Sequence, residues 1–143
     1  MDKFLKATSL TTFLCHSHTD RDAVHDLYLR LKKDHMQPWL DRENLLPGQN
    51  WRIEIRRAIL RSDIVIVCLS RSFDQKKGFR HEEINIALEK ANLFPSGEIY
   101  IIPARLEKCD MPESLRYLHR VDLFEKDGYA KLIQVLCKQA ESL

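Results

Sequence analysis

The sequence is poor in the residues that keep chains disordered or that cross-link small secreted domains. Its 143 residues include only 4 Gly and 5 Pro, against 44% hydrophobic and 31% charged residues. This composition excludes a disordered chain and indicates one globular domain with a single core. Four cysteines stand far apart without CxxC spacing: Cys15, Cys68, Cys109 and Cys137. Because free thiols in apolar runs behave as small hydrophobes, we expect a reducing, cytoplasmic setting.

Charge of one sign and long apolar runs are also missing. Lys and Arg number 23 and Asp and Glu 21, which gives a formal net charge of +2. This balance favours neither a nucleic-acid-binding protein nor a membrane-surface protein, and the arginines within 52–61 are expected to form a solvated helix face. No apolar stretch is long enough to span a bilayer and no signal peptide is recognisable, so we expect no membrane partner.

The apolar residues fall into short runs separated by helical patterns. The runs 11–15, 63–70 and 98–106 are almost continuously apolar and rich in β-branched residues, which predicts strands buried on both faces. Weaker strand candidates are 37–40 and 119–124. This alternation predicts a flavodoxin-like α/β fold, a doubly wound sheet of five parallel strands with helices on both faces.

Apolar residues at helical spacing predict the connecting helices. The segments are 19–35, 50–62, the stretch after the third strand that includes 84–91, and 128–139, with a short turn or two in 111–118. Thr19 and Asn50 are the expected N-caps of the first two helices. In the second helix, Trp51 is expected on the buried stripe with Ile55, Ala58 and Ile59.

Ligands of such a sheet bind beyond the carboxyl ends of its strands, which directs attention to three loops: 16–20, 41–50 and 70–83. The first loop holds His16 and His18, which share one side of an extended segment. No third ligand has recognisable spacing, so we predict no metal site. Ser17 and Thr19 could offer hydroxyls to a ligand instead.

The second loop opens with the acidic residues Asp41 and Glu43 and turns at the Pro-Gly dipeptide 47–48. The glycine is expected to supply the positive φ that such a turn requires. Leu45 and Leu46 precede the turn and look exposed. Two interpretations stay open: the loop meets a partner, or it folds back on its own domain.

Common catalytic motifs of α/β proteins are absent. No GxxxxGK[ST] loop is present for phosphoryl transfer, and no GxSxG elbow is present for acyl transfer. A receiver domain would need an acceptor aspartate at the end of the third strand, where Cys68, Leu69 and Ser70 stand. These three reaction classes are therefore disfavoured.

Two adjacent glutamates begin the helix after the third strand, in the segment GFRHEEINIAL at 78–88. At about 100° per residue, Glu82 points about 170° from the centre of the apolar stripe, into solvent. Glu83 lies at about 90°, on the border of the buried face, and Ile86 points outward at about 150°. Glu83 is therefore the glutamate that faces the ligand-binding edge of the sheet.

The three loops together resemble the Toll/interleukin-1 receptor (TIR) domain family. FLCHSHTD (13–20) is similar to the family's first box, and the segment 39–70 is similar to its second box, with the spacing W-L-D-x-E-x-L-x-P-G-x-x-W. The segment 101–133 completes a form typical of prokaryotic TIR domains, and FRHEEI (79–84) matches the family's [WYF]-V-x-K-E-[IL] motif. We expect one TIR domain in residues 1–143, with a core of about 10–142, as one part of a longer protein.

The resemblance implies an NAD⁺ glycohydrolase in which Glu83 is catalytic and Phe79 packs beside the nicotinamide or ribose. Substrate-lining residues implied by the family are Ser17, His18, Asp41, Glu43 and Ser70. NAD⁺ is the substrate, and no metal or other cofactor is required. The product is ADP-ribose or a cyclic isomer of it. Two residues depart from the usual pattern, because Cys15 replaces a serine and Glu82 replaces a basic residue.

The resemblance also implies self-association with other TIR domains, as the effector part of a prokaryotic immune or stress-signalling protein. Candidate interface residues are Leu45, Leu46, Gly48 and Ile86. The alternative is a non-catalytic TIR–TIR interaction module that assembles through the same surfaces. The presence of Glu83 in register favours the enzyme.

Overall fold

The computed structural model describes residues 9–73, 79–94 and 98–142, with the backbone alone for 79–81. Its elements, in which η denotes a 3-10 helix, are β1 (Thr11–Cys15), η1 (His18–Asp20), α2 (Arg21–Lys33), β2 (Gln37–Trp39), α3 (Asp41–Asn44), α4 (Trp51–Arg61), β3 (Ile64–Leu69), α5 (Phe79–Ala91), β4 (Ile101–Arg105), η2 (Glu113–Leu115), β5 (Val121–Asp122) and α6 (Gly128–Ala140). All strand pairs are parallel, in the order β2-β1-β3-β4-β5. The predicted doubly wound, five-stranded sheet is confirmed.

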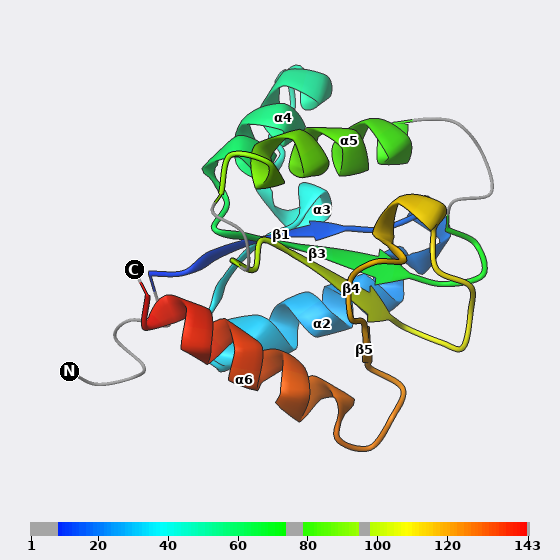
Figure 1. Cartoon of the computed structure of the whole chain (residues 1–143). Coiled ribbons are helices and arrows are strands. Elements are labelled where there is room, and N and C mark those ends of the chain that lie inside the picture. Colours follow the sequence, from blue (N-terminus) through cyan, green and yellow to red (C-terminus); the bar gives the residue numbers. More distant parts are fainter. Residues whose placement is uncertain (1–8, 74–78, 95–97, 143) are drawn as a thin grey trace.

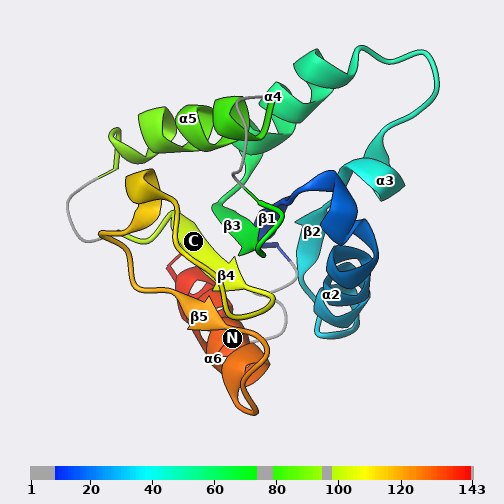
Figure 2. The same cartoon turned by 90° about the vertical axis from the view of Figure 1, so that its right-hand side faces the viewer.

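Helices cover both faces of the sheet, with α4 and α5 on one side and α2 and α6 on the other (Figures 1 and 2). Side chains alternate along each strand, so the sheet divides the apolar interior in two. In β3, Ile64, Ile66 and Cys68 join the α2 and α6 side, whereas Val65 and Val67 join the α4 and α5 side. The single core expected from chain length is therefore two cores.

The outer strands are shorter than the runs that predict them. β5 spans two residues and pairs with β4 only at Ala104–Val121 and Arg105–Asp122. Pro103 precedes this pairing within β4 and lies opposite Val67 of β3. The first part of β4 therefore has a neighbouring strand on one side alone among the described residues.

Helix starts agree with the sequence in one case and differ in another. The Asn50 side chain accepts from the Ile53 N–H at 3.3 Å, which confirms the predicted N-cap of α4. Thr19 is not an N-cap, because residues 18–20 form η1 and α2 then begins at Arg21. The error arises because a 3-10 turn continues directly into the α-helix.

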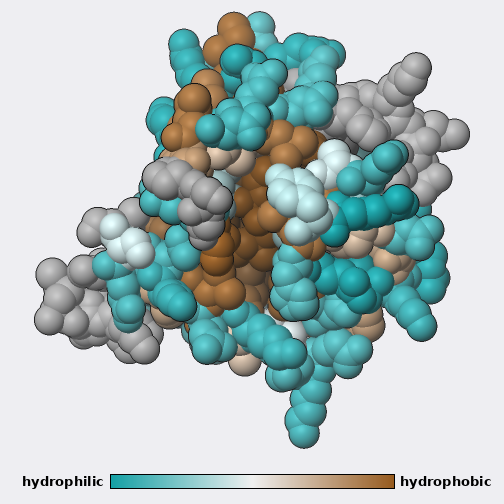
Figure 3. Space-filling model, in the orientation of Figure 1, coloured by the Kyte–Doolittle hydropathy of each residue, from teal (hydrophilic) through white to brown (hydrophobic). Residues whose placement is uncertain are grey.

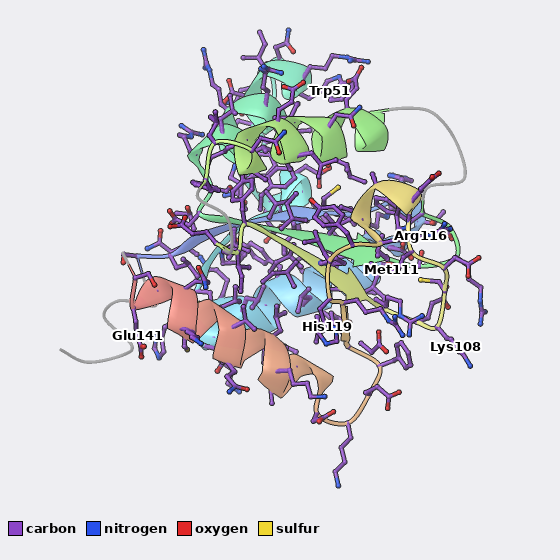
Figure 4. All side chains as sticks on the ribbon, in the orientation of Figure 1. Trp51, Lys108, Met111, Arg116, His119 and Glu141 are labelled. Carbon is purple, nitrogen blue, oxygen red and sulfur yellow. The ribbon has the colours of Figure 1, made fainter. Side chains whose placement is uncertain are left out.

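Trp51 is not on the buried stripe of α4. Its side chain is 47% exposed, and the Arg52 guanidinium lies 5.0 Å from the ring centroid. Figure 4 shows Trp51 on the outer side of the α4 layer, away from the sheet. As the first residue of the helix, Trp51 precedes the turns that pack on the sheet through Ile55 and Ile59. The predicted turn is confirmed, since Gly48 has φ 89°.

Candidate functional site

Glu82 and Glu83 point in different directions, as the helical spacing predicts. The Glu82 side chain is 52% exposed and accepts from the Arg52 guanidinium of α4 at 2.9 Å. Glu83 is only 3% exposed. The angular estimate placed Glu83 at a border, whereas it is buried, because residues of β1, β2, α3 and α4 surround it. Pairing with Arg52 also offsets the negative charge of Glu82 beside Glu83.

Glu83 lines a small internal pocket at the carboxyl edge of the sheet, which has no room for a water molecule. The other lining residues are Phe13, Leu14, His16, Trp39, Asp41 and Ile55. The rings of Phe13 and Trp39 stack with centroids 5.2 Å apart. A carboxylate is costly to bury unless it is paired or hydrogen-bonded. The wall around Glu83 is largely apolar, and its other polar residues are His16 and Asp41.

His16 and Asp41 separate the Glu83 pocket from an open cavity of about 460 Å³, because both residues line both spaces. His16 Nε2 lies 3.5 Å from Asp41 Oδ1, and His16 Nδ1 donates to the Ser17 carbonyl at 2.8 Å. His16 is 4% exposed. The other residues of the open cavity are His18, Arg21, Asp22, Arg42 and Leu45. The structure thus brings Glu83, His18 and Asp41 of the predicted site to one region.

Glu43 lies apart from the other predicted pocket residues. Its Oε1 lies 3.6 Å from His25 Nε2 of α2, and it lines neither the Glu83 pocket nor the open cavity. Arg42 binds Asp22 of α2 at 3.1 Å. The short helix α3 is therefore held against α2 by two side-chain contacts, of which Arg42–Asp22 lines the open cavity.

Ser17 and Ser70 meet at Asp20, a residue that sequence reasoning did not single out. Ser17 Oγ donates to Asp20 Oδ2 at 2.8 Å, and Ser70 Oγ donates to the same oxygen at 2.5 Å. Ser70 Oγ also accepts from the Ser72 N–H at 3.1 Å. Both hydroxyls predicted to contact substrate thus fix the loops after β1 and β3 to each other. The available signal was the aspartate that ends FLCHSHTD.

Some predicted residues stand outside this region. Phe79 begins α5, but its side chain lies outside the described residues. Leu45 and Ile86 are half-buried and pack against the α4 and α5 core. The outward orientation predicted for Ile86 is therefore wrong, because α4 covers that side of α5. Leu46 is 63% exposed. The loop after β2 therefore combines both interpretations, with Leu45 folded back and Leu46 presented to solvent.

A larger cavity, about 730 Å³, lies at the other end of α5. Figure 3 shows this hydrophobic hollow between the layers of α5 and α6. It is lined by the start of β4, the end of α5 and one side of α6, and Glu83 is not among its residues. Size alone therefore does not locate the candidate site.

A thiolate nucleophile, a metal site and a membrane-spanning helix each place requirements on the described residues. Burial raises the pKa of the Cys68 thiol to about 12, so this cysteine at the end of β3 is no thiolate nucleophile. Within the described ranges, no three His, Cys, Asp or Glu residues cluster in a way that could hold a metal ion. No described helix is long and apolar enough to cross a membrane.

The sequence profile of the TIR domain matches residues 12–136. The chain therefore belongs to the TIR domain family. It is 27% identical over 112 residues to the uncharacterized protein y4cD of Sinorhizobium fredii, a match that covers 77% of this chain. The chain spans about 17% of the length of that relative.

Solved structures share the fold at low sequence identity. The TIR domain of the Toll-related receptor TRR-2 from Hydra magnipapillata superposes with a TM-score of 0.72 and 21% identity, covering 87% of this chain and 96% of that one. The TIR domains of the activated Roq1 resistosome superpose with a TM-score of 0.60 and 19% identity, covering 92% of this chain and 84% of that one. The CMP N-glycosidase BcmB of Clostridium botulinum superposes with a TM-score of 0.57 and 18% identity, covering 87% of this chain and 98% of that one.

Proposed function

We propose that this TIR domain is an NAD⁺ glycohydrolase in which Glu83 is the catalytic carboxylate. The observation that carries the proposal is the burial of Glu83 at the carboxyl edge of the sheet, beside His16 and Asp41. Ligands of open α/β sheets bind at that edge. A carboxylate at that edge, next to an open cavity, is placed to act on a bound ligand.

One carboxylate is sufficient for the chemistry. The nicotinamide of NAD⁺ is a cationic leaving group and departs neutral, so its departure needs no general acid. Breaking the N-glycosidic bond leaves positive charge on the ribosyl centre, which a fixed carboxylate stabilises electrostatically. Water then attacks the ribosyl carbon to give ADP-ribose, or an internal nucleophile attacks it to give a cyclic isomer. The similarity to BcmB supports this reaction class, since that protein is a CMP N-glycosidase.

Self-association is part of the proposed function. The Glu83 pocket has no room for a water molecule, so substrate must enter after the wall formed by His16 and Asp41 moves. Asp41 belongs to the loop that also presents Leu46 to solvent, so contact with a neighbouring subunit would act on that wall. The Roq1 TIR domains belong to an activated resistosome, which supports assembly as the trigger. The greater length of y4cD supports the proposal that this domain is one part of a longer protein.

The second candidate is a non-catalytic interaction module. The closed Glu83 pocket favours it, because an unassembled chain offers a nucleotide no space at that carboxylate. Only the glycohydrolase releases free nicotinamide, so this product distinguishes the two candidates.

The test follows nicotinamide release by chromatography from NAD⁺ incubated with concentrated or artificially clustered protein. We expect clustered wild type to release nicotinamide and Glu83→Gln to lose at least about a hundredfold in rate, as expected when a charged stabilising group is removed. Glu82→Gln is the matched control, because it removes the neighbouring charge from an exposed position. No release by clustered wild type would favour the interaction module, and loss in Glu82→Gln alone would reassign the catalytic residue.

A further inference from the structure

The open cavity beside Glu83 is lined by two arginines and two aspartates, and one of the arginines pairs with neither aspartate. Of its charged residues, Asp41 lies against His16 at 3.5 Å and Asp22 binds Arg42 at 3.1 Å. The remaining guanidinium, that of Arg21, is exposed, and its closest polar partner is His18 Nε2 at 3.5 Å. Among the described residues it has no carboxylate partner. A fixed cation in a cavity, next to a carboxylate pocket, fits an anionic part of a ligand.

Arg21 is held at a defined place in this cavity. It is the first residue of α2 and directly follows η1, whose Asp20 is bonded to Ser17 and Ser70. These bonds fix the backbone on which Arg21 stands relative to the ends of β1 and β3. The guanidinium is a planar fork of donors that matches two phosphate oxygens at once.

The connectivity of a nicotinamide nucleotide places a phosphate on this side of the site. The nicotinamide is bonded to C1′ of the ribose, and the phosphate is bonded to C5′, the exocyclic carbon attached to C4′. With C1′ at Glu83, the phosphate must extend from the small pocket into adjoining space. The open cavity is that space, because His16 and Asp41 line both.

We infer that Arg21 binds the phosphate on the 5′ carbon of the substrate ribose and so restricts this chain to phosphorylated nucleotides. The inference rests on the proposed function and names a residue that determines specificity. Arg42 is less suited to the role, since Asp22 already occupies its guanidinium. Nicotinamide riboside has the same N-glycosidic bond but no phosphate, and gains nothing from Arg21.

Two measurements on wild type and Arg21→Gln test the inference. We expect the affinity of clustered protein for ADP-ribose, measured by isothermal titration calorimetry, to fall about tenfold or more with loss of a charge-assisted hydrogen-bonded pair. In clustered protein, kcat/KM for NAD⁺ should fall by a similar factor through KM, whereas kcat/KM for nicotinamide riboside should not change. Arg56→Gln, an exposed arginine on α4, is the control for loss of one positive charge.

The outcomes separate this inference from the proposed reaction. Equal affinity of wild type and Arg21→Gln for ADP-ribose overturns the inference, as does failure of wild type to bind ADP-ribose. An equal fall in kcat/KM for NAD⁺ and nicotinamide riboside also overturns it, because that pattern indicates a structural effect. If ADP-ribose binding depends on Arg21 but no nicotinamide is released, the proposed reaction fails and the phosphate-binding role of Arg21 remains.

Discussion

Charged side chains inside this protein are fixed by partners on other elements, and Arg105 of β4 is an example at the scale of single residues. Arg105 Nε and Nη2 donate to the two carboxylate oxygens of Asp122 in β5 at 2.7 and 2.8 Å, and Nη1 donates to the Cys109 carbonyl at 2.7 Å. The hydrogen bond with Arg105 holds the pKa of Asp122 below its ordinary value. Because folding favours the ionised carboxylate, this pair links stability to pH.

Asp122→Ala should lower the free energy of unfolding by about 3 kcal/mol at pH 7, because it leaves Arg105 buried without its carboxylate. Since the folded-state pKa is lowered, the contribution is fully present above the unfolded-state pKa of Asp122. It is lost as the pH falls through the folded-state pKa. Urea unfolding at pH 7 and at successively lower pH should therefore show the difference between wild type and variant shrinking.

Asp127→Ala is the control, since Asp127, the N-cap residue of α6, forms an exposed pair with Lys131 and makes no side-chain capping hydrogen bond, so it contributes little. A difference between wild type and Asp122→Ala that stays constant with pH would show that lost packing, rather than the ion pair, causes the destabilisation.

At the scale of elements, α6 is fixed by a close approach of backbones at its first residue. A Cβ atom at Gly128 would lie 1.9 Å from the Asp122 carbonyl oxygen and 2.9 Å from the Leu123 Cα. Glycine is therefore required for α6 to start directly against β5. The apolar spacing predicts this helix from residue 128 but gives no reason for glycine, because the close approach depends on tertiary packing.

Gly128→Ala should destabilise the protein by about 2 kcal/mol, as overpacking against rigid backbone does. Helix propensity alone predicts the opposite sign, since alanine is favoured over glycine by about 1 kcal/mol within a helix. Thermal and urea unfolding decide between the two. Lys131→Ala, an exposed substitution on the same helix, is the control and should change stability little. Increased stability in Gly128→Ala would show that α6 shifts freely.

How far the sequence predicts this molecule depends on whether a feature is local or arises from packing. β1, β3 and β4 are predictable because strands buried on both faces leave continuous apolar runs. Glu83 is predictable because helical spacing separates it from Glu82. Trp51 and Ile86 are not, since their exposure depends on where α4 meets the sheet and α5. Asp20 and Arg21 acquire their roles only when loops distant in sequence come together.

The whole molecule presents large apolar side chains on its outer surface near the loop after β2. Leu46 precedes the turn, and Trp51 and Ile53 lie in the first turn of α4, all of them exposed. Exposed apolar residues grouped in one part of the chain are typical of an interaction surface. Leu46 and Asp41 both belong to the connection between β2 and α4, so in the proposed function assembly and access to Glu83 involve the same segment.

Leu46→Glu combined with Trp51→Glu should weaken self-association at least about tenfold, because each charge would be desolvated in an apolar contact. Size-exclusion chromatography with light scattering, over a range of protein concentrations, measures the change. Leu29→Glu is the control, since Leu29 is similarly exposed but lies on α2. Unchanged association in the double variant, or loss in Leu29→Glu alone, would move the interface to another face.

The short strand β5 has a consequence for the behaviour of the protein at high concentration. Val65 N–H donates to the Tyr100 carbonyl, and Leu123 N–H donates to the Arg105 carbonyl, so odd-numbered residues of β4 direct their backbone groups away from β3. Pro103 is one of these residues and has no backbone N–H. It therefore offers no hydrogen-bond donor on the side of β4 that β5 leaves unpaired at this position. An uncovered strand edge invites pairing with strands of other molecules, and proline blunts such an edge. The residue that interrupts the hydrogen-bond ladder thus protects the sheet from aggregation where its neighbouring strand is too short to cover it.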